Sequence, residues 1–366
     1  MTRRNQVGQL FMLGFAGTSI SKHLADFLIE YRPGGLILFA RNLDTPSQIA
    51  SLTNALQEYA SDPPLLISVD QEGGRVSRLP AGFTIFPACE VIGRCNSSEL
   101  AYAAASATGA ELRAVGINMN LAPILDVNTN PANPIIGNRS FGASPTLVCE
   151  LGLATISGLQ DNKVLACGKH FPGHGDTSAD SHCELPVITA SLERLRALEL
   201  RPFLHAIEHR LASIMTAHVL YPALDGHLPA TLSSAILTDL LRGQLRFTGL
   251  TLTDDLDMRA ITDHHGIEEA AVQAVLAGAD MLLIGQDRDR QVGAMEAVLR
   301  AVTDGTISTQ RLDASLRRIA QAKSQFLKPY APVELHAVTE TVGKSAHNAL
   351  LDTIRRTSER RLKASV

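Results

Sequence analysis

The stretch "GLTLTDDL", residues 249–256, shows the pattern from which the fold of this 366-residue chain can be predicted. A short run of leucine and threonine follows a glycine and ends on two aspartates. Short runs that are hydrophobic almost throughout are typical of parallel strands buried on both faces. Seven further apolar runs, each bounded by glycine, proline or polar residues, occupy residues 10–15, 34–39, 64–70, 116–127, 165–171, 212–219 and 280–285.

Segments with helical periodicity lie between these runs. Several of them begin with Ser or Thr followed by an acidic or amide residue, which is a helix-start signal. The clearest segments are residues 45–60, 98–116, 191–210 and 267–279. Strand–helix alternation repeated about eight times predicts an α/β fold, a single-domain (β/α)8 barrel of the TIM type. A doubly wound parallel sheet is the alternative.

The chain beyond residue 286 is predicted to be helical, with a proline-containing break at "KPYAPVE", residues 328–334. We assign residues 1–330 to the barrel. Residues 331–366 are predicted to form a C-terminal helical tail that is packed on the barrel or frayed from it. The arginines of this tail are interpreted as a solvated helix face.

Composition and charge exclude several classes of function. The chain is 45% hydrophobic and 19% charged, with a net charge of −4, which argues against nucleic acid or an anionic membrane as partner. The sequence contains no run of about 18 apolar residues, so no transmembrane helix is predicted. Five cysteines, without a CxxC pair or an evident secretory leader, indicate reduced thiols and a cytoplasmic location. A monomer is the working hypothesis, although no sequence signal supports it.

Polar residues follow the predicted strands at their carboxyl ends. An active site of a (β/α)8 barrel is built at that face, so this placement predicts a functional site. The residues concerned are Asp70, Asp126, Lys169, His170, His218, Asp254 and Asp255.

The stretch "KHFPGHGDTSADSH", residues 169–182, combines three histidines with aspartates and helix-breaking residues. Metal binding, acid–base catalysis and a solvated loop are all compatible with it. His170 and His174 are four residues apart, but the intervening "FPG" prevents them from sharing a helical face as a zinc-binding HExxH pair does. A metal cluster that includes His182 stays open as an alternative.

A second glycine-rich stretch, "QEGGRVSR" at residues 71–78, matches neither a dinucleotide-binding nor a Walker motif. It is either a plain turn or a loop that grips hydroxyl or carboxylate groups. The chain also lacks the GxSxG elbow of a seryl hydrolase. Carboxylates are therefore the better candidates for a nucleophile, and "LTDDLDM" offers two adjacent ones, Asp254 and Asp255.

Six motifs in order, "VDQEGGRVSRL", "NLAPILDVN", "GNRSFG", "GKHFPGHGDTSADSH", "MTAHVLYPALD" and "LTDDLDM", resemble the family 3 glycoside hydrolases. The likeness covers about residues 5–330 and is strongest to the bacterial single-domain β-N-acetylglucosaminidases of peptidoglycan recycling. The resemblance implies a retaining, exo-acting enzyme that removes terminal GlcNAc from peptidoglycan fragments without a metal or cofactor.

The resemblance also implies the roles of individual residues. Asp254 would be the nucleophile, and His182 with Asp180 the acid/base dyad. The terminal sugar would be held by Asp70, Arg78, Arg139, Lys169 and His170. His174 is interpreted as a loop brace, Asp126 as structural or indirect, and His218 as either a residue of the barrel mouth or a satisfied core histidine.

Four other functions are compatible with the sequence. They are a metal-dependent hydrolase on the same barrel, a non-catalytic sugar-binding module, a family 3 β-glucosidase, and a phosphorylase that acts on GlcNAc glycosides.

Overall fold

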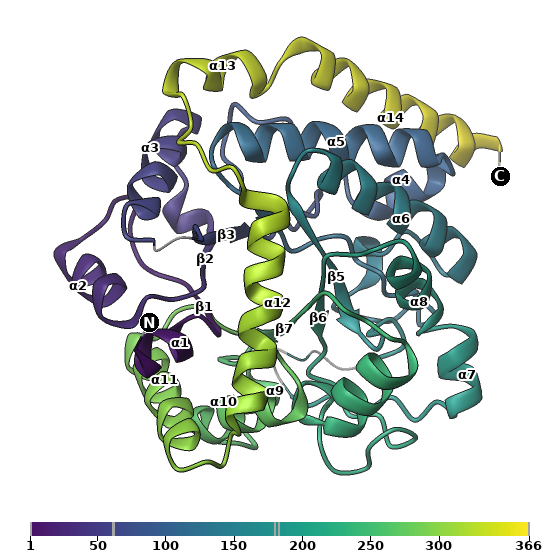
Figure 1. Ribbon diagram of the computed structural model, residues 1–366. Helices are drawn as coiled ribbons and strands as arrows, with labels where there is room; N and C mark the ends of the chain where they lie inside the picture. Colours follow the sequence, from purple (N-terminus) through teal and green to yellow (C-terminus); the bar gives the residue numbers. More distant parts are fainter. Residues whose placement is uncertain (1, 61–62, 179–180, 182–183, 365–366) are drawn as a thin grey trace.

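The computed structural model describes residues 2–60, 63–178, 181 and 184–364, and its centre is a closed barrel of eight parallel strands (Figure 1). Each strand pairs with the next, and β1 pairs with β8, where Phe11 lies opposite Leu282. The predicted (β/α)8 fold is confirmed. The strands are β1 (Phe11–Leu13), β2 (Gly35–Leu38), β3 (Leu66–Val69), β4 (Met119–Asn120), β5 (Leu165–Phe171), β6 (Ser213–Thr216), β7 (Leu250–Asp255) and β8 (Met281–Ile284).

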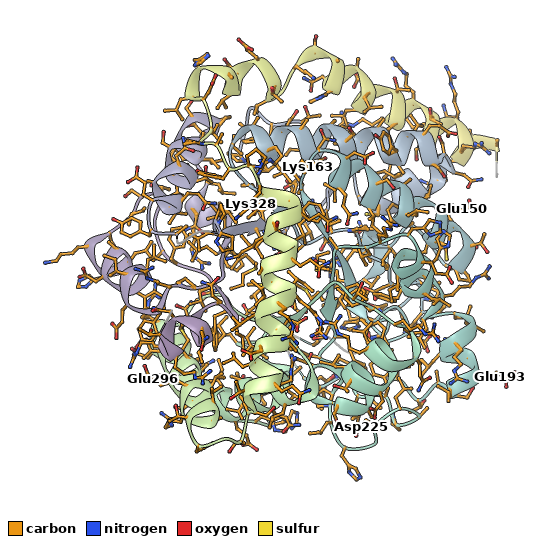
Figure 2. All side chains as sticks on the ribbon, in the orientation of Figure 1. Glu150, Lys163, Glu193, Asp225, Glu296 and Lys328 are labelled. Atoms are coloured by element: carbon orange, nitrogen blue, oxygen red, sulfur yellow. The ribbon has the colours of Figure 1, made fainter. Side chains whose placement is uncertain are left out.

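Each predicted apolar run contains one of these strands, and nearly every strand residue is buried. The strands lie between the side chains that fill the barrel and the helices that surround it. This double burial explains why the runs are apolar almost throughout rather than alternating. Charged side chains such as Glu150, Lys163 and Glu193 are exposed on the outside of the molecule (Figure 2).

The helices surround the barrel and extend the chain beyond it. They are α1 (Arg3–Gly8), α2 (Lys22–Tyr31), α3 (Pro46–Gln57), α4 (Cys89–Cys95), α5 (Ser98–Ala114), α6 (Pro145–Asp161), α7 (Leu192–Ala197), α8 (Arg201–Glu208), the π-helix η4 (Ala235–Gln244), α9 (Arg259–Thr262), α10 (Ile267–Ala277), α11 (Arg288–Thr303), α12 (Thr309–Leu327), α13 (Val338–Thr341) and α14 (Ser345–Ala364). Single 3₁₀ turns add η1 (Ala40–Asn42), η2 (Gly137–Arg139), η3 (Ala230–Leu232) and η5 (Leu335–Ala337).

Helix starts follow the predicted signals. The side chains of Thr45 and Ser97 accept hydrogen bonds from backbone N–H groups in the first turns of α3 and α5. One prediction is wrong in detail, since residues 191–210 form two helices, α7 and α8, instead of one. Pro202 lies in the first turn of α8, where its missing N–H costs nothing, whereas inside a continuous helix it would remove a hydrogen bond.

The last helices cover two different parts of the barrel. Helix α12 crosses the amino ends of the strands, where Arg311 and Arg318 both bond to Asp280. Helix α14 runs along α4 and α5. The structure thus places helices after residue 330, while the domain boundary there stays a prediction.

Two further observations concern the chemistry of the chain. Cys89, Cys95, Cys149 and Cys167 are buried and free, and Cys183 lies outside the described residues. Among the described residues, no helix has the length and apolar character needed to cross a membrane.

Candidate active site

A cavity of about 330 Å³ opens at the carboxyl ends of the strands, at the face where the polar residues were predicted to meet. Cavities of this size are typical of small-molecule sites. Six of the eight predicted site residues lie together in the wall of this cavity. The lining comprises Asp70, Glu72, Arg75, Val76, Arg78, Ile135, Arg139, Lys169, His170, His174, Ser181 and Asp254.

The end of β5 contributes two neighbouring side chains, Lys169 and His170. In a regular strand, neighbours point to opposite faces. Here the pairing of β5 with β6 shifts register between Gly168 and Phe171, and both side chains line the cavity. Such irregularities are common beside active sites because they redirect a side chain.

Lys169 lies between two carboxylates. Its Nζ is 2.7 Å from Asp70 Oδ1 and 2.7 Å from Glu72 Oε1. Burial by itself lowers the pKa of this ammonium group, but the two carboxylates raise it above its usual value. Lys169 is therefore a fixed cation at the cavity wall.

Glu72 is the site residue that sequence reasoning missed. Its side chain is 1% exposed, and its two oxygens each lie 2.8 Å from the guanidinium of Arg139 in a bidentate pair. Burial opposes its ionisation, but the charges of Lys169 and Arg139 hold the pKa of Glu72 far below its usual range. The available signal was its place two residues after Asp70, within the glycine-rich stretch already singled out.

Asp126 orients His170 from behind. Its Oδ2 lies 2.8 Å from His170 Nδ1, and its Oδ1 accepts the backbone N–H groups of His170 and His174 at 3.0 and 2.7 Å. Burial raises the pKa of Asp126, but His170 more than reverses this and the pKa is lowered. An ionised Asp126 assigns the proton to Nδ1 and leaves Nε2 of His170 available to a ligand. The interpretation of Asp126 as an indirect contributor agrees with this geometry.

The two adjacent aspartates of β7 have different environments. Asp254 lines the cavity, and although burial opposes its ionisation, the nearby imidazoles of His170 and His218 lower its pKa. Asp255 turns away, and its Oδ1 accepts the backbone N–H groups of Asp257 and Gly285 at 3.0 and 3.1 Å. Burial raises the pKa of Asp255 to about 7. Of the two adjacent aspartates, therefore, Asp254 is the one that lines the cavity with a lowered pKa.

The remaining histidines of the site have supporting positions. His174 Nδ1 lies 2.9 Å from Thr177 Oγ1, and its Nε2 lies 3.2 Å from Ser181 Oγ. Burial lowers the pKa of His174 to about 4, so it is a neutral brace near pH 7. His218 is buried, with Nδ1 2.7 Å from Thr231 Oγ1 and Nε2 3.0 Å from the Asp255 carbonyl oxygen.

The proposed dyad, Asp180 and His182, lies outside the described residues. Ser181 is described and belongs to the cavity wall. Within the described part of the chain, no group of three or more His, Cys, Asp or Glu side chains is arranged to hold a metal ion. A cluster that includes His182 stays untested.

The profile described as "Glycosyl hydrolase family 3 N terminal domain" matches residues 2–322. The chain belongs to glycoside hydrolase family 3. The resemblance inferred from the six motifs is confirmed, and with it the assignment of the chain as a glycosidase.

Named relatives of this family 3 chain agree with one another. "Beta-hexosaminidase A" of Pseudoalteromonas piscicida is 37% identical over 96% of this chain, which spans only 65% of that relative's length. "Beta-hexosaminidase" of Nitrosomonas eutropha is 41% identical over 76% of this chain and 81% of its own. The structure of a family 3 β-N-acetylglucosaminidase from Paenibacillus sp. superposes with a TM-score of 0.92 at 44% identity, over 98% of this chain and 69% of that one.

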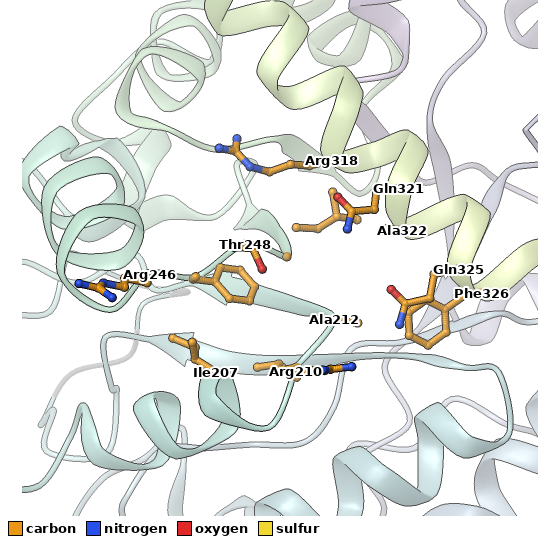
Figure 3. Close-up of a pocket in the computed structure, with 14 residues that line it drawn as sticks. Ile207, Arg210, Ala212, Arg246, Thr248, Arg318, Gln321, Ala322, Gln325 and Phe326 are labelled. Atoms are coloured by element: carbon orange, nitrogen blue, oxygen red, sulfur yellow. The ribbon is translucent and has the colours of Figure 1, made fainter.

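A second cavity of about 430 Å³ lies at the opposite end of this family 3 barrel (Figure 3). It lies between α12 and the residues that precede β6 and β7, and Arg210, Arg246 and Arg318 line it. Catalytic sites of (β/α)8 barrels occur at the other face, so this cavity is not the candidate active site.

The buried charges of the site lead to a first prediction, on stability. Replacing Glu72 by glutamine should lower the free energy of unfolding by about 3 to 5 kcal/mol at pH 7, because Arg139 and Lys169 lose a buried counter-charge. Since the folded pKa of Glu72 is depressed, its contribution is present above the unfolded pKa of about 4.3 and is lost progressively as the pH falls from there through the folded pKa. Urea unfolding at pH 7, and at a series of pH values below 4, measures both effects.

The matched control for this prediction is Glu90→Gln, which breaks the exposed ion pair with Arg94. An exposed pair of this kind is worth about 0 to 1 kcal/mol. If Glu72→Gln changes the free energy of unfolding no more than Glu90→Gln does, the charge network does not stabilise the fold.

Proposed function

We propose that this family 3 enzyme is a retaining, exo-acting β-N-acetylglucosaminidase. Its substrates would be peptidoglycan fragments such as GlcNAc–anhydro-MurNAc peptides, from which it removes the terminal non-reducing GlcNAc. The observation that carries the proposal is Asp254, with a lowered pKa, in a cavity where Asp70, Glu72, Lys169 and Arg139 are already held in ion pairs. Choice of the sugar is supported by the relatives, which are named β-hexosaminidases and a β-N-acetylglucosaminidase.

In the first step, Asp254 attacks the anomeric carbon and forms a glycosyl ester while the bond to the leaving oxygen breaks. His182, oriented by Asp180, donates a proton to that oxygen. In the second step, His182 takes a proton from water, which attacks the anomeric carbon and releases Asp254. Two displacements at one carbon retain the β-configuration.

Two of the donors that would hold the sugar, Lys169 and Arg139, are fixed before it binds. Lys169 is bonded to Asp70 and Glu72, and Arg139 to Glu72, so these donors lose little freedom on binding. A chain with no tryptophan and only 4% aromatic residues favours a hydrogen-bonded grip on one terminal sugar over an extended stacking groove. This composition supports exo action. The cysteines, which have no CxxC pair, support a cytoplasmic location, where recycled wall fragments would be met.

A panel of chromogenic glycosides tests the proposed specificity. The β-GlcNAc glycoside should be cleaved faster than the β-glucoside and the β-xyloside, and EDTA should leave the rate unchanged. Faster cleavage of the β-glucoside would favour a β-glucosidase, and loss of activity with EDTA a metal-dependent hydrolase. No cleavage of any glycoside would favour a sugar-binding module.

The same residues are also compatible with a phosphorylase, in which phosphate replaces water as the acceptor. A histidine acid repels the incoming phosphate anion less than a carboxylate acid would. The panel is therefore run with and without phosphate, and the products are identified. GlcNAc as product with and without phosphate supports hydrolysis, whereas GlcNAc 1-phosphate would show that phosphate replaces water.

The stereochemical outcome is a second prediction. The first product should be the β-anomer of GlcNAc, because a carboxylate nucleophile implies double displacement. Proton NMR, recorded before mutarotation, identifies this anomer. A thiazoline inhibitor, which mimics attack by the substrate's own 2-acetamido group, should bind poorly. An α-anomeric product or nanomolar inhibition by the thiazoline would contradict covalent catalysis by Asp254.

A further inference from the structure

Residues 331–364, here called the C-terminal segment, contact the loop that forms one wall of the cavity. That loop, residues 70–88 and here called the substrate loop, leaves β3 and ends where α4 begins. It carries five of the cavity residues, Asp70, Glu72, Arg75, Val76 and Arg78. We propose that the C-terminal segment positions the substrate loop, and that Glu111 and His347 are positioning residues for sugar binding. The inference rests on the proposed function only in taking this cavity as the sugar site.

Glu111 of α5 joins the two parts through one buried carboxylate, which is 1% exposed. Its Oε2 accepts the backbone N–H of Thr84, in the substrate loop, at 2.8 Å. Its Oε1 accepts the backbone N–H of Gly343 at 3.1 Å and lies 2.6 Å from His347 Nδ1. Both oxygens are used, so loss of the imidazole would leave a buried carboxylate short of a donor.

The two parts also touch directly at Gly343 and Gly82. A Cβ added at Gly343 would lie 2.2 Å from the carbonyl oxygen of Gly82, and Gly343 has a φ of +66°. Only glycine allows so close an approach of two backbones in this conformation. The C-terminal segment is thus packed against the middle of the substrate loop.

A second contact holds the far end of the substrate loop. Helix α4 follows the loop directly, and α14 packs along it (Figure 1). Cys95 Sγ donates to the Ile354 carbonyl oxygen at 3.3 Å, and Arg94 Nε donates to Ser358 Oγ at 3.1 Å. The C-terminal segment therefore contacts the loop directly at Gly82 and at its far end through α4, and it reaches Thr84 through Glu111.

Between those points, the loop supports its own tip. The Gly74 N–H donates to the Phe86 carbonyl oxygen at 3.0 Å, and a Cβ at Gly74 would lie 2.6 Å from the Cβ of Ala88. The turn that holds Glu72 and Arg75 thus rests on residues 86–88. A shift of those residues must move the turn, and misplacement of a positioning group by about 1 Å can cost about 10²-fold in rate.

The test is His347→Ala, assayed on whichever β-glycoside the wild type cleaves. KM should rise about tenfold while kcat changes less, because contacts to sugar hydroxyls are made in both the ground state and the transition state. His347→Asn should restore KM to within about twofold, since its amide can replace Nδ1 as the donor to Glu111. The matched control is Leu312→Ala, which opens a cavity under α12, away from the substrate loop, and should leave KM unchanged.

Hydrogen exchange supplies a readout that needs no substrate. Backbone amides of residues 72–78 should exchange faster in His347→Ala and not in Leu312→Ala. If the wild type cleaves no glycoside, the proposed function fails, and the exchange measurement still decides this inference. If His347→Ala does not fold, Ser358→Ala removes only the bond to Arg94 and should raise KM about threefold. Unchanged KM and loop exchange in a folded variant, or an equal rise of KM in Leu312→Ala, would overturn the inference.

Discussion

Asp254→Ala should lose essentially all glycoside cleavage, with kcat reduced on the order of 10⁴- to 10⁶-fold. The physical reason is that, of the described carboxylates that line the cavity, Asp254 is the one that is not ion-paired with Lys169. Asp70 and Glu72 are bonded to Lys169, and Asp255 is turned toward backbone N–H groups. Steady-state rates on an activated aryl glycoside measure the loss.

The matched control is the neighbouring substitution Asp255→Asn. The pKa of Asp255 is raised to about 7, and its Oδ1 accepts two backbone N–H groups, which an amide oxygen can also do. Asp255→Asn should therefore keep appreciable activity. A 2-deoxy-2-fluoro glycosyl inactivator should label the peptide at Asp254, and a label on Asp255 or Asp257 would show that the nucleophile has been misassigned.

The division between these two aspartates shows what sequence reasoning could and could not provide. Strand alternation alone did not choose between Asp254 and Asp255, and the choice came from the family resemblance. In the structure the choice depends on Gly285, which follows β8 and supplies an N–H to Asp255. It also depends on a register shift between β7 and β8 near Asp255. Both are long-range features that no local pattern encodes.

The fold itself was more predictable, because burial on both faces leaves a direct signature in each strand. Glu72 was missed for the opposite reason. Its importance comes from Arg139 and Lys169, which lie on distant segments and meet it only in the folded chain. The contact of Glu111 with His347 is equally invisible in the sequence, since a glutamate on a helix and a histidine on another have no local reason to be paired. Local pattern thus predicts which elements form, while partners across the barrel decide what each side chain does.

His182→Ala should slow the cleavage of a substrate more, the poorer the leaving group of that substrate is. A p-nitrophenolate departs with little protonation, whereas a sugar hydroxyl needs a proton in the transition state, an effect worth about 10²- to 10⁴-fold. A disaccharide substrate should therefore slow far more than an activated aryl glycoside, for which azide should restore turnover by attacking the glycosyl-enzyme. Asp180→Asn should give a milder form of the same defect, because the imidazole would be misoriented and not deleted.

His336→Ala, which removes an exposed histidine, serves as the matched control and should leave both substrates unaffected. Equal losses on both substrates in His182→Ala would mean that His182 binds sugar or shapes the loop, and that the proton comes from elsewhere. The nearest described alternatives in the motif are poorly suited to donate it. His174 has a pKa lowered to about 4 by burial, with both ring nitrogens engaged. Asp176 is ion-paired with Arg194 at 2.8 Å and accepts a hydrogen bond from Thr129. The leaving-group dependence of His182→Ala is therefore a direct test of the dyad, because both described neighbours are already held by other partners.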